Sequence, residues 1–217
     1  MKPNDELHYP PSSLVLIAGL PGAGKTTFLA RLFQLRGDES HPQVVHGVHV
    51  IDSQQSRNWW ARHLRFLHPR ARTPVTHSTH IWRITRAVFS GHNVVAHTRG
   101  TWAHVLYGFA ALARLRGTRV HLVLLDVPPQ TARAGQHARG RTVTEVTFRR
   151  HCRRWRALLD RARDGKLTAA ASVTVLDRNL ADVIRGIRFT AARTARTPES
   201  RQAQQSCEDP IVLTRTG

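Results

Sequence analysis

The feature that most constrains the fold is a glycine-rich segment, residues 19–26, which follows the pattern G-x-x-x-x-G-K-[ST]. The apolar run over residues 14–18 predicts a buried β-strand that ends where this segment begins. Apolar residues at helical spacing from Phe28 to Leu35 predict a helix that ends near Gly37. A strand, a glycine-rich loop and a helix in this order are typical of a phosphate-binding P-loop. The alternative is a plain glycine-rich turn between the two elements.

The residue types in this segment are chemically suited to binding the phosphates of a nucleotide. Glycines let the backbone approach a phosphate closely, and successive N–H groups with the helix N-terminus form an anion-binding nest. We expect Lys25 to reach the β- and γ-phosphates and the Thr26 hydroxyl to ligate Mg²⁺, so the predicted cofactors are ATP and Mg²⁺. The predicted nucleotide-binding residues are Gly19, Leu20, Pro21, Gly22, Ala23, Gly24, Lys25, Thr26 and Thr27.

Alternating apolar segments predict an α/β fold. Strands are predicted over residues 14–18, 44–51, 93–97, 119–127 and 172–176, and helices over residues 25–37, 53–67, 77–89, 101–115, 128–138, 143–162 and 179–189. Short strands that are apolar on both sides are typical of a parallel sheet covered by helices on both faces. We therefore expect about five parallel strands in one domain over residues 13–190, with a flexible leader over residues 1–12 and a disordered tail over residues 191–217.

The composition limits which cellular compartment and which binding partners are expected. The chain has 33 Lys and Arg against 14 Asp and Glu, a formal net charge of +19, which attracts polyanions. Arginines are scattered through every segment, so a coding bias is the alternative, and no clustered motif indicates a nucleic-acid partner. Two distant cysteines, Cys152 and Cys207, fit a reducing compartment. Without a signal peptide or membrane-length apolar run, we expect a cytoplasmic, monomeric enzyme with no membrane partner.

Three stretches together resemble the small P-loop kinases. They are the glycine-rich loop, D-S-Q-Q-S-R at residues 52–57, and L-L-D-V-P at residues 124–128, which leads into A-R-G-R at residues 138–141. The branch contains polynucleotide kinases, zeta toxins and many chains called AAA family ATPases. The resemblance covers roughly residues 14–189. It implies a kinase-like P-loop NTPase, and the P-loop itself is specific for nucleotide binding rather than for one substrate.

The resemblance implies a catalytic role for Asp52 and Arg57. In these kinases, the Asp after the second strand faces the acceptor hydroxyl, and an Arg a few positions later steadies the acceptor. A carboxylate near the attacking oxygen can take its proton and help to place Mg²⁺. The alternative is structural, because Asp52 or Ser53 can also cap the following helix.

The resemblance also implies a lid. Arg139 and Arg141 match the arginines that close over the phosphates, although two solvated arginines at a helix end are the alternative. The chain departs from the pattern at Gly135, where relatives usually carry an earlier lid Arg, and Arg133 is a candidate substitute one helical turn away. His137 stands at another basic position.

A second departure lies at the end of the predicted third strand. Relatives commonly end this strand with an Asp that helps to hold Mg²⁺, whereas this chain has His97. Because Mg²⁺ prefers oxygen ligands, His97 does not replace that carboxylate. It can contact substrate, accept a proton, or serve as a hydrogen-bonded structural residue.

Two functions are compatible with these residues. The first is a phosphotransferase that moves the γ-phosphate of ATP to a hydroxyl of a small molecule or a polynucleotide end, and Asp52, Arg57 and the Arg139/Arg141 lid favour it. The second is an ATP-binding or ATPase module with a regulatory role and no acceptor, which the departures at His97 and Gly135 favour. The sequence does not identify the acceptor.

Overall fold

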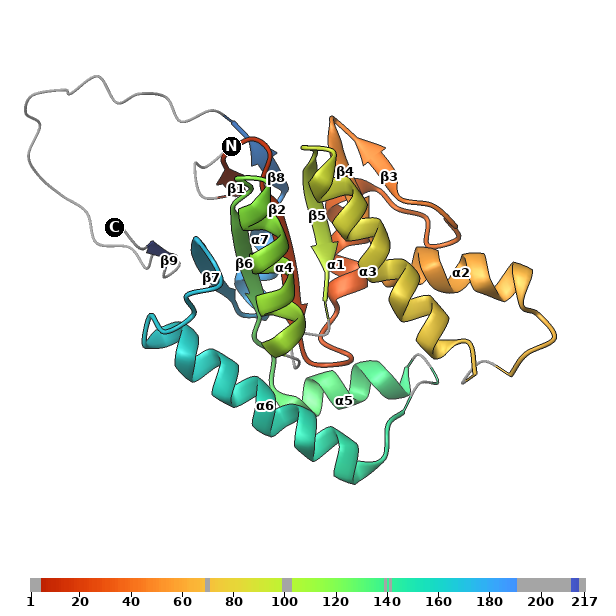
Figure 1. Ribbon diagram of the computed structural model, residues 1–217. Coiled ribbons are helices and arrows are strands. Elements are labelled where there is room, and N and C mark those ends of the chain that lie inside the picture. Colours follow the sequence, from red (N-terminus) through yellow and green to blue (C-terminus); the bar gives the residue numbers. More distant parts are fainter. Residues whose placement is uncertain are drawn as a thin grey trace, which may run out of the picture.

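The structure, a computed structural model, describes residues 5–68, 71–98, 103–138, 140, 142–190 and 212–214 (Figure 1). The strands are β1 (Glu6–Tyr9), β2 (Leu14–Gly19), β3 (Gln43–Val45), β4 (Val48–Ile51), β5 (Asn93–His97), β6 (Val120–Leu125), β7 (Ser172–Leu176), β8 (Gly186–Phe189) and β9 (Val212–Thr214). The helices are α1 (Lys25–Phe33), α2 (Ser53–His63), α3 (Thr73–Phe89), α4 (Ala103–Leu115), α5 (Pro129–His137), α6 (Glu145–Arg163) and α7 (Arg178–Val183). Within these ranges no helix is both long and apolar enough to cross a membrane.

The main sheet has the strand order β3-β4-β5-β2-β6-β7-β9. Its five inner strands, β4, β5, β2, β6 and β7, are parallel, whereas β3 and β9 pair antiparallel at the two edges. The predicted α/β fold with about five parallel strands is confirmed. The central strand β2 pairs with β5 on one side and β6 on the other, so the loop that follows β2 emerges at the middle of the carboxyl edge.

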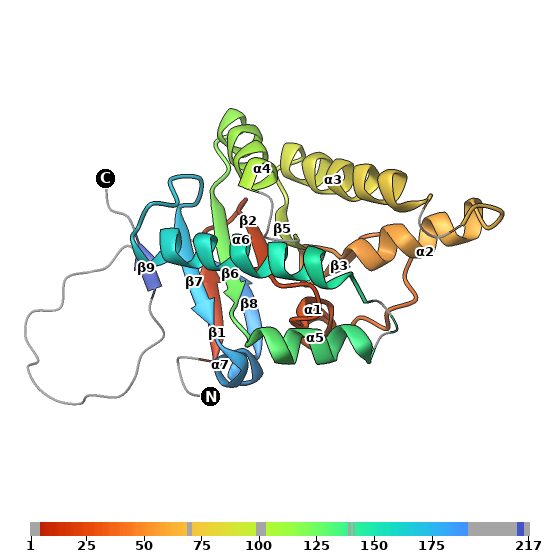
Figure 2. The same ribbon diagram turned by 90° about the horizontal axis from the view of Figure 1, so that it is seen from below.

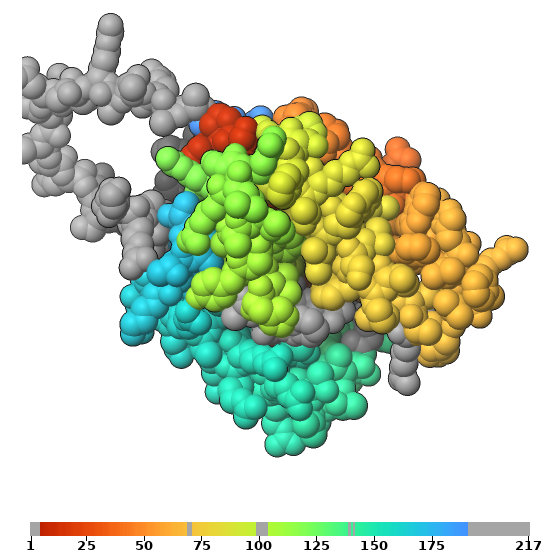
Figure 3. All heavy atoms as spheres, in the orientation of Figure 1, coloured from red at the N-terminus to blue at the C-terminus, as the bar shows by residue number. Residues whose placement is uncertain are grey.

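Apolar side chains fill both faces of the sheet. Leu14 and Leu16 of β2 face a cluster that includes α3, α4 and α6, whereas Val15 and Ile17 face a second cluster with α1 and the β1–β8 pair. This alternation follows from the twofold repeat of a strand. The space-filling view shows α3, α4 and α6 covering one face of the molecule (Figure 3). Helices on both faces keep the sheet buried and leave its carboxyl edge to carry polar groups.

The prediction of a single strand over residues 44–51 is wrong. β3 and β4 form an antiparallel hairpin, and the turn between them is made by His46 at φ 50° and Gly47 at φ 75°. Two consecutive residues with positive φ are typical of the tight turns that connect hairpin strands. Only β4 joins the parallel part of the sheet, and it leads directly to Asp52.

The expectations for the two ends of the domain also need correction. Residues 6–9, expected in a flexible leader, form β1, which pairs in parallel with β8 and buries Tyr9 to 6% exposure. The final helix expected over residues 179–189 stops at Val183, and residues 186–189 are the strand β8. Residues 212–214, expected in the tail, pair with β7 as β9. The rest of the predicted tail lies outside the described residues.

Candidate active site

The glycine-rich loop takes a conformation that exposes its backbone to a ligand. Gly22 and Gly24 have φ values of 91° and 89°, which residues with a side chain rarely adopt. Gly24 is also the N-cap of α1. The Lys25 ammonium donates hydrogen bonds to the carbonyl oxygens of Gly19, at 2.8 Å, and of Leu20, at 2.9 Å. These two hydrogen bonds hold the lysine over the loop.

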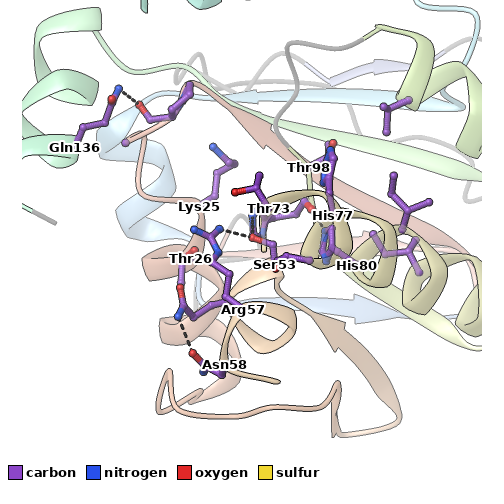
Figure 4. Close-up of a pocket in the computed structure, with 18 of the residues that line it drawn as sticks. Lys25, Thr26, Ser53, Arg57, Asn58, Thr73, His77, His80, Thr98 and Gln136 are labelled. Atoms are coloured by element: carbon purple, nitrogen blue, oxygen red, sulfur yellow. Dashed lines mark hydrogen bonds between the residues drawn. The ribbon is translucent and has the colours of Figure 1, made fainter. Parts of the chain in front are cut away.

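A cavity of about 860 Å³ opens at the carboxyl edge of the sheet, with the P-loop as one wall (Figure 4). Other walls come from α2, α3, the end of β5 and α5, with smaller contributions from α4 and α6. Of the nine predicted nucleotide-binding residues, the lining set is Pro21, Gly22, Gly24, Lys25 and Thr26. Leu20 and Ala23 are packed in the core, Thr27 is exposed on α1, and Gly19 packs closely against the Leu125 carbonyl oxygen.

Helix α5 packs directly against the P-loop (Figure 2). A Cβ atom at Gly135 would come within 2.5 Å of the Gly22 carbonyl oxygen, so no side chain fits there. The Gln136 side chain donates a hydrogen bond to the Pro21 carbonyl oxygen at 2.9 Å. This close approach gives the departure at Gly135 a physical reason. Arg133 pairs with Glu145, and it is not among the residues that line the cavity.

Asp52 follows β4 and is the N-cap of α2. Its Oδ1 accepts a hydrogen bond from the Gln54 N–H at 2.6 Å, and the Gln55 side chain accepts one from the Asp52 N–H at 3.1 Å, which completes a capping box. Burial raises the pKa of the Asp52 carboxyl, but the charge and hydrogen bond of the adjacent His97, together with weaker hydrogen-bond contributions, hold this pKa well below its usual range. The weaker contributions come from the Gln54 N–H and the Thr26 hydroxyl, so the carboxyl is ionised beside Thr26.

Ser53, Arg57 and His97 meet in front of this carboxylate. His97 Nδ1 lies 3.4 Å from Asp52 Oδ1, and its Nε2 lies 3.1 Å from the Ser53 hydroxyl oxygen. The Arg57 guanidinium donates a hydrogen bond to the same hydroxyl oxygen at 2.7 Å. Figure 4 shows Arg57 turned towards Ser53, and Ser53, Arg57 and His97 all line the cavity whereas Asp52, at 2% exposure, lies behind them.

His80 of α3 fixes the position of His97. Its Nε2 lies 2.9 Å from the His97 carbonyl oxygen, at the end of β5. Burial, with a smaller contribution from the His97 charge, lowers the pKa of His80 to about 3. His80 is therefore neutral near pH 7 and donates its Nε2–H to that carbonyl oxygen.

Arg139 and Arg141 lie outside the described residues. Asp126 accepts a hydrogen bond from the Trp155 indole and contacts Arg163, and Asp177 caps α7. They follow β6 and β7 respectively, and neither lines the cavity.

Comparisons with known proteins identify the family of the chain. The model of a family described as an AAA domain, AAA_33, matches residues 14–164. The chain belongs to this AAA domain family. No curated protein matches it.

Solved structures extend the comparison. A chain of the PezAT chromosomal toxin–antitoxin system of Streptococcus pneumoniae matches with a TM-score of 0.55 and 18% identity, over 78% of this chain and 70% of that one. The tunicamycin resistance protein of Deinococcus radiodurans has a TM-score of 0.47 and 14% identity, over 80% and 92%. A gluconokinase from Sinorhizobium meliloti 1021 has a TM-score of 0.45 and 15% identity, over 82% and 90%. The first likeness shows the fold alone.

The AAA domain thus has the kinase-like P-loop NTPase fold that the sequence predicts. Its site also fits Mg²⁺, because the Thr26 hydroxyl lines the cavity beside the ionised Asp52, and hard oxygen atoms suit this ion. Asp52 Oδ2 is buried and has no hydrogen-bond partner of regular geometry among the described residues. A bound Mg²⁺ would neutralise charge on the phosphates of a nucleotide.

Two site residues of this AAA domain escaped sequence reasoning. Ser53 was weighed only as a helix cap, although its place beside Asp52 and four residues before Arg57 was a usable signal. Gln136 carried no signal, because its partner Pro21 is 115 residues away in the sequence.

Proposed function

We propose that the protein is an ATP-dependent phosphotransferase that moves the γ-phosphate of ATP·Mg²⁺ to an alcohol. The observation that carries this proposal is the composition of the cavity, where Lys25 and Thr26 share one space with Ser53, Arg57 and His97. A volume of about 860 Å³ lies at the upper end of the range for small-molecule sites. It leaves room for an acceptor between the P-loop and α3.

Each group has a role in this reaction. Lys25 contacts the β- and γ-phosphates, and Thr26 ligates Mg²⁺. Asp52, ionised behind His97, supports removal of the acceptor proton, and Arg57 steadies the acceptor beside the γ-phosphate. Arg139 and Arg141 are proposed to close over the phosphates from the segment after α5. The γ-phosphoryl group passes to the acceptor oxygen, and ADP leaves.

A regulatory ATP-binding or ATPase module without an acceptor is the second candidate. The observation that favours it is the position of Asp52, which caps α2 and lies behind the residues that line the cavity. The loss of a lid arginine at Gly135 points the same way.

A screen with γ-labelled ATP decides between the two. The full chain with Mg²⁺ is offered nucleosides, oligonucleotides, sugars and antibiotic alcohols, and transfer of label to one class supports the phosphotransferase. Hydrolysis of ATP without any labelled acceptor supports the regulatory module.

Lys25→Ala tests the nucleotide site itself. It removes a charge-assisted phosphate contact, so we expect ATP affinity to fall by about 10- to 100-fold, which corresponds to about 1.5–3 kcal/mol. Lys166→Ala is the matched control, because Lys166 is an exposed lysine that pairs with Asp164 far from the cavity. Calorimetric titration with ATP measures both variants. Unchanged affinity and turnover in Lys25→Ala would contradict nucleotide binding by the P-loop.

A further inference from the structure

Asp52, His97 and Ser53 form a connected series that ends in the cavity. The buried Asp52 carboxylate lies 3.4 Å from His97 Nδ1, and His97 Nε2 lies 3.1 Å from the Ser53 hydroxyl oxygen. His97 comes from β5 and the other two from the β4–α2 junction. The arrangement exists because β4 and β5 are neighbouring parallel strands, which end at the same edge of the sheet.

These three groups stand in the order of a nucleophile, a base and a residue that orients the base. When His97 is neutral, with its one proton on Nδ1 facing Asp52, the ring presents the Nε2 lone pair to the Ser53 O–H. An adjacent base activates a serine hydroxyl, and an acid behind the base holds the correct tautomer. The 3.1 Å contact has hydrogen-bond length, whereas the buried His97 Nδ1 meets Asp52 at 3.4 Å without a hydrogen bond of regular geometry among the described residues. Catalytic contacts of this kind tighten when a substrate binds.

The electrophile that this serine would meet is the γ-phosphate of ATP. Ser53 lines the same cavity as Lys25 and Thr26. The Thr26 hydroxyl is close enough to Asp52, the residue before Ser53, to lower the pKa of its carboxyl. Arg57 donates a hydrogen bond to the Ser53 oxygen at 2.7 Å, so positive charge already lies at the reacting atom.

We infer that Ser53 is itself a phosphoryl acceptor and that the protein phosphorylates its own Ser53 with ATP. The Ser53 oxygen forms a bond to the γ-phosphorus, and the bond from that phosphorus to the β,γ-bridging oxygen breaks. The bonding electrons leave with ADP, and the hydroxyl proton passes to His97 Nε2. The inference rests on the proposed binding of ATP at the P-loop.

The product is stabilised where it forms. Phosphoserine at position 53 lies in the first turn of α2, where the helix N-terminus favours negative charge. Arg57, one turn later on the same helix, is placed to pair with the phosphate.

The test uses the full chain with γ-labelled ATP and Mg²⁺, followed by trypsin digestion and fragmentation mass spectrometry. The peptide over residues 37–57 contains Ser40, Ser53 and Ser56, and we expect the added phosphate on Ser53. Ser53→Ala should abolish the label. Ser56→Ala is the matched control and should keep it, because Ser56 lies one turn further on α2, fully buried and within 3.3 Å of Arg83.

Two further variants test the mechanism. His97→Gln removes the base, so we expect labelling to slow by about 10²- to 10⁴-fold while ATP still binds. A Lys25→Ala chain keeps Ser53 but binds ATP about 10- to 100-fold more weakly. At an ATP concentration that fills only the unmodified site, it should stay unlabelled when it is mixed with the unmodified protein, because Ser53 faces its own cavity. Labelling of the Lys25→Ala chain by its neighbour would overturn the intramolecular step.

The outcomes separate this inference from the proposed function. An unlabelled Ser53 in a protein that binds ATP and phosphorylates an added alcohol overturns the inference and leaves the proposed function standing. Label on Ser40 or Ser56 also overturns it. A chain that does not bind ATP·Mg²⁺ overturns both.

Discussion

At the scale of single residues, Asp52 combines two roles that a substitution can separate. Its Oδ1 caps α2 by accepting the Gln54 N–H, and its negative charge lies beside His97 and Thr26. An asparagine keeps a cap acceptor of the same size but removes the charge. A loss of phosphoryl transfer without a loss of stability would therefore assign the chemistry to the charge.

For Asp52→Asn we expect near-normal ATP affinity and melting temperature, and a rate of phosphoryl transfer lower by about 10²- to 10⁴-fold. Labelled ATP with the acceptor from the screen measures the rate. Asp177→Asn is the matched control, since Asp177 also caps a helix after a strand, but it follows β7 and caps α7 rather than standing beside His97. Phosphoryl transfer at the parental rate in Asp52→Asn would show that Asp52 serves only as a helix cap.

At the scale of elements, the packing of α5 on the P-loop decides what the site can accommodate. The Gly22 carbonyl oxygen occupies the space that a side chain at Gly135 would need, and Gln136 ties the helix to Pro21. The two glycines allow the backbones of α5 and the loop to approach, and this approach excludes a lid arginine at position 135.

Gly135→Ala tests this contact. A Cβ at 2.5 Å from a backbone oxygen forces the loop or α5 to move, at a cost of about 1–3 kcal/mol, so we expect a lower melting temperature and weaker ATP binding. Gly108→Ala is the control in α4, where the new Cβ meets nothing within 4 Å and alanine favours the helix by up to about 1 kcal/mol. Thermal unfolding with and without ATP compares them, and a stabilised Gly135→Ala would contradict the close contact.

At the scale of the whole molecule, two buried histidines make stability depend on pH. Burial lowers the pKa of His80 to about 3, and burial with the Arg119 charge lowers the pKa of His121 to about 4. Both folded-state values lie below the unfolded value of about 6.5, so below that pH the unfolded chain binds protons that the folded chain does not. The free energy of unfolding must therefore fall as the pH drops from about 6.5 towards 4.

We expect each histidine to contribute at most about 1.4 kcal/mol per pH unit to this loss, and less for the partly screened His121. Urea unfolding between about pH 7 and pH 5 measures the slope. His121→Asn should flatten it, whereas His63→Asn should leave it unchanged because His63 is exposed on α2. An equal dependence of the unfolding free energy on pH in the two variants would contradict the assignment of this dependence to His121.

The sequence by itself determined the P-loop and the parallel core of the sheet. Both depend on local patterns, because the loop needs glycines beside a lysine and each inner strand needs a short apolar run. The order of loop, strand and Asp52 along the chain also placed the candidate site at the carboxyl edge. The hairpin of β3 and β4 was missed although its turn at His46 and Gly47 is local and interrupts the apolar run, because the apolar residues on either side were assigned to one strand.

Only the tertiary structure decided the pairing of β1 with β8, the contact of Gly135 with Gly22 and the approach of His97 to Ser53. The partners are separated along the chain by 44 residues for His97 and Ser53, and by far more for the two strands. No local sequence pattern encodes a contact between residues so far apart along the chain. These contacts form when the two faces of the sheet bury their apolar clusters and the strands align at one edge. This burial brings a histidine, a serine and an aspartate together beside the glycine-rich loop.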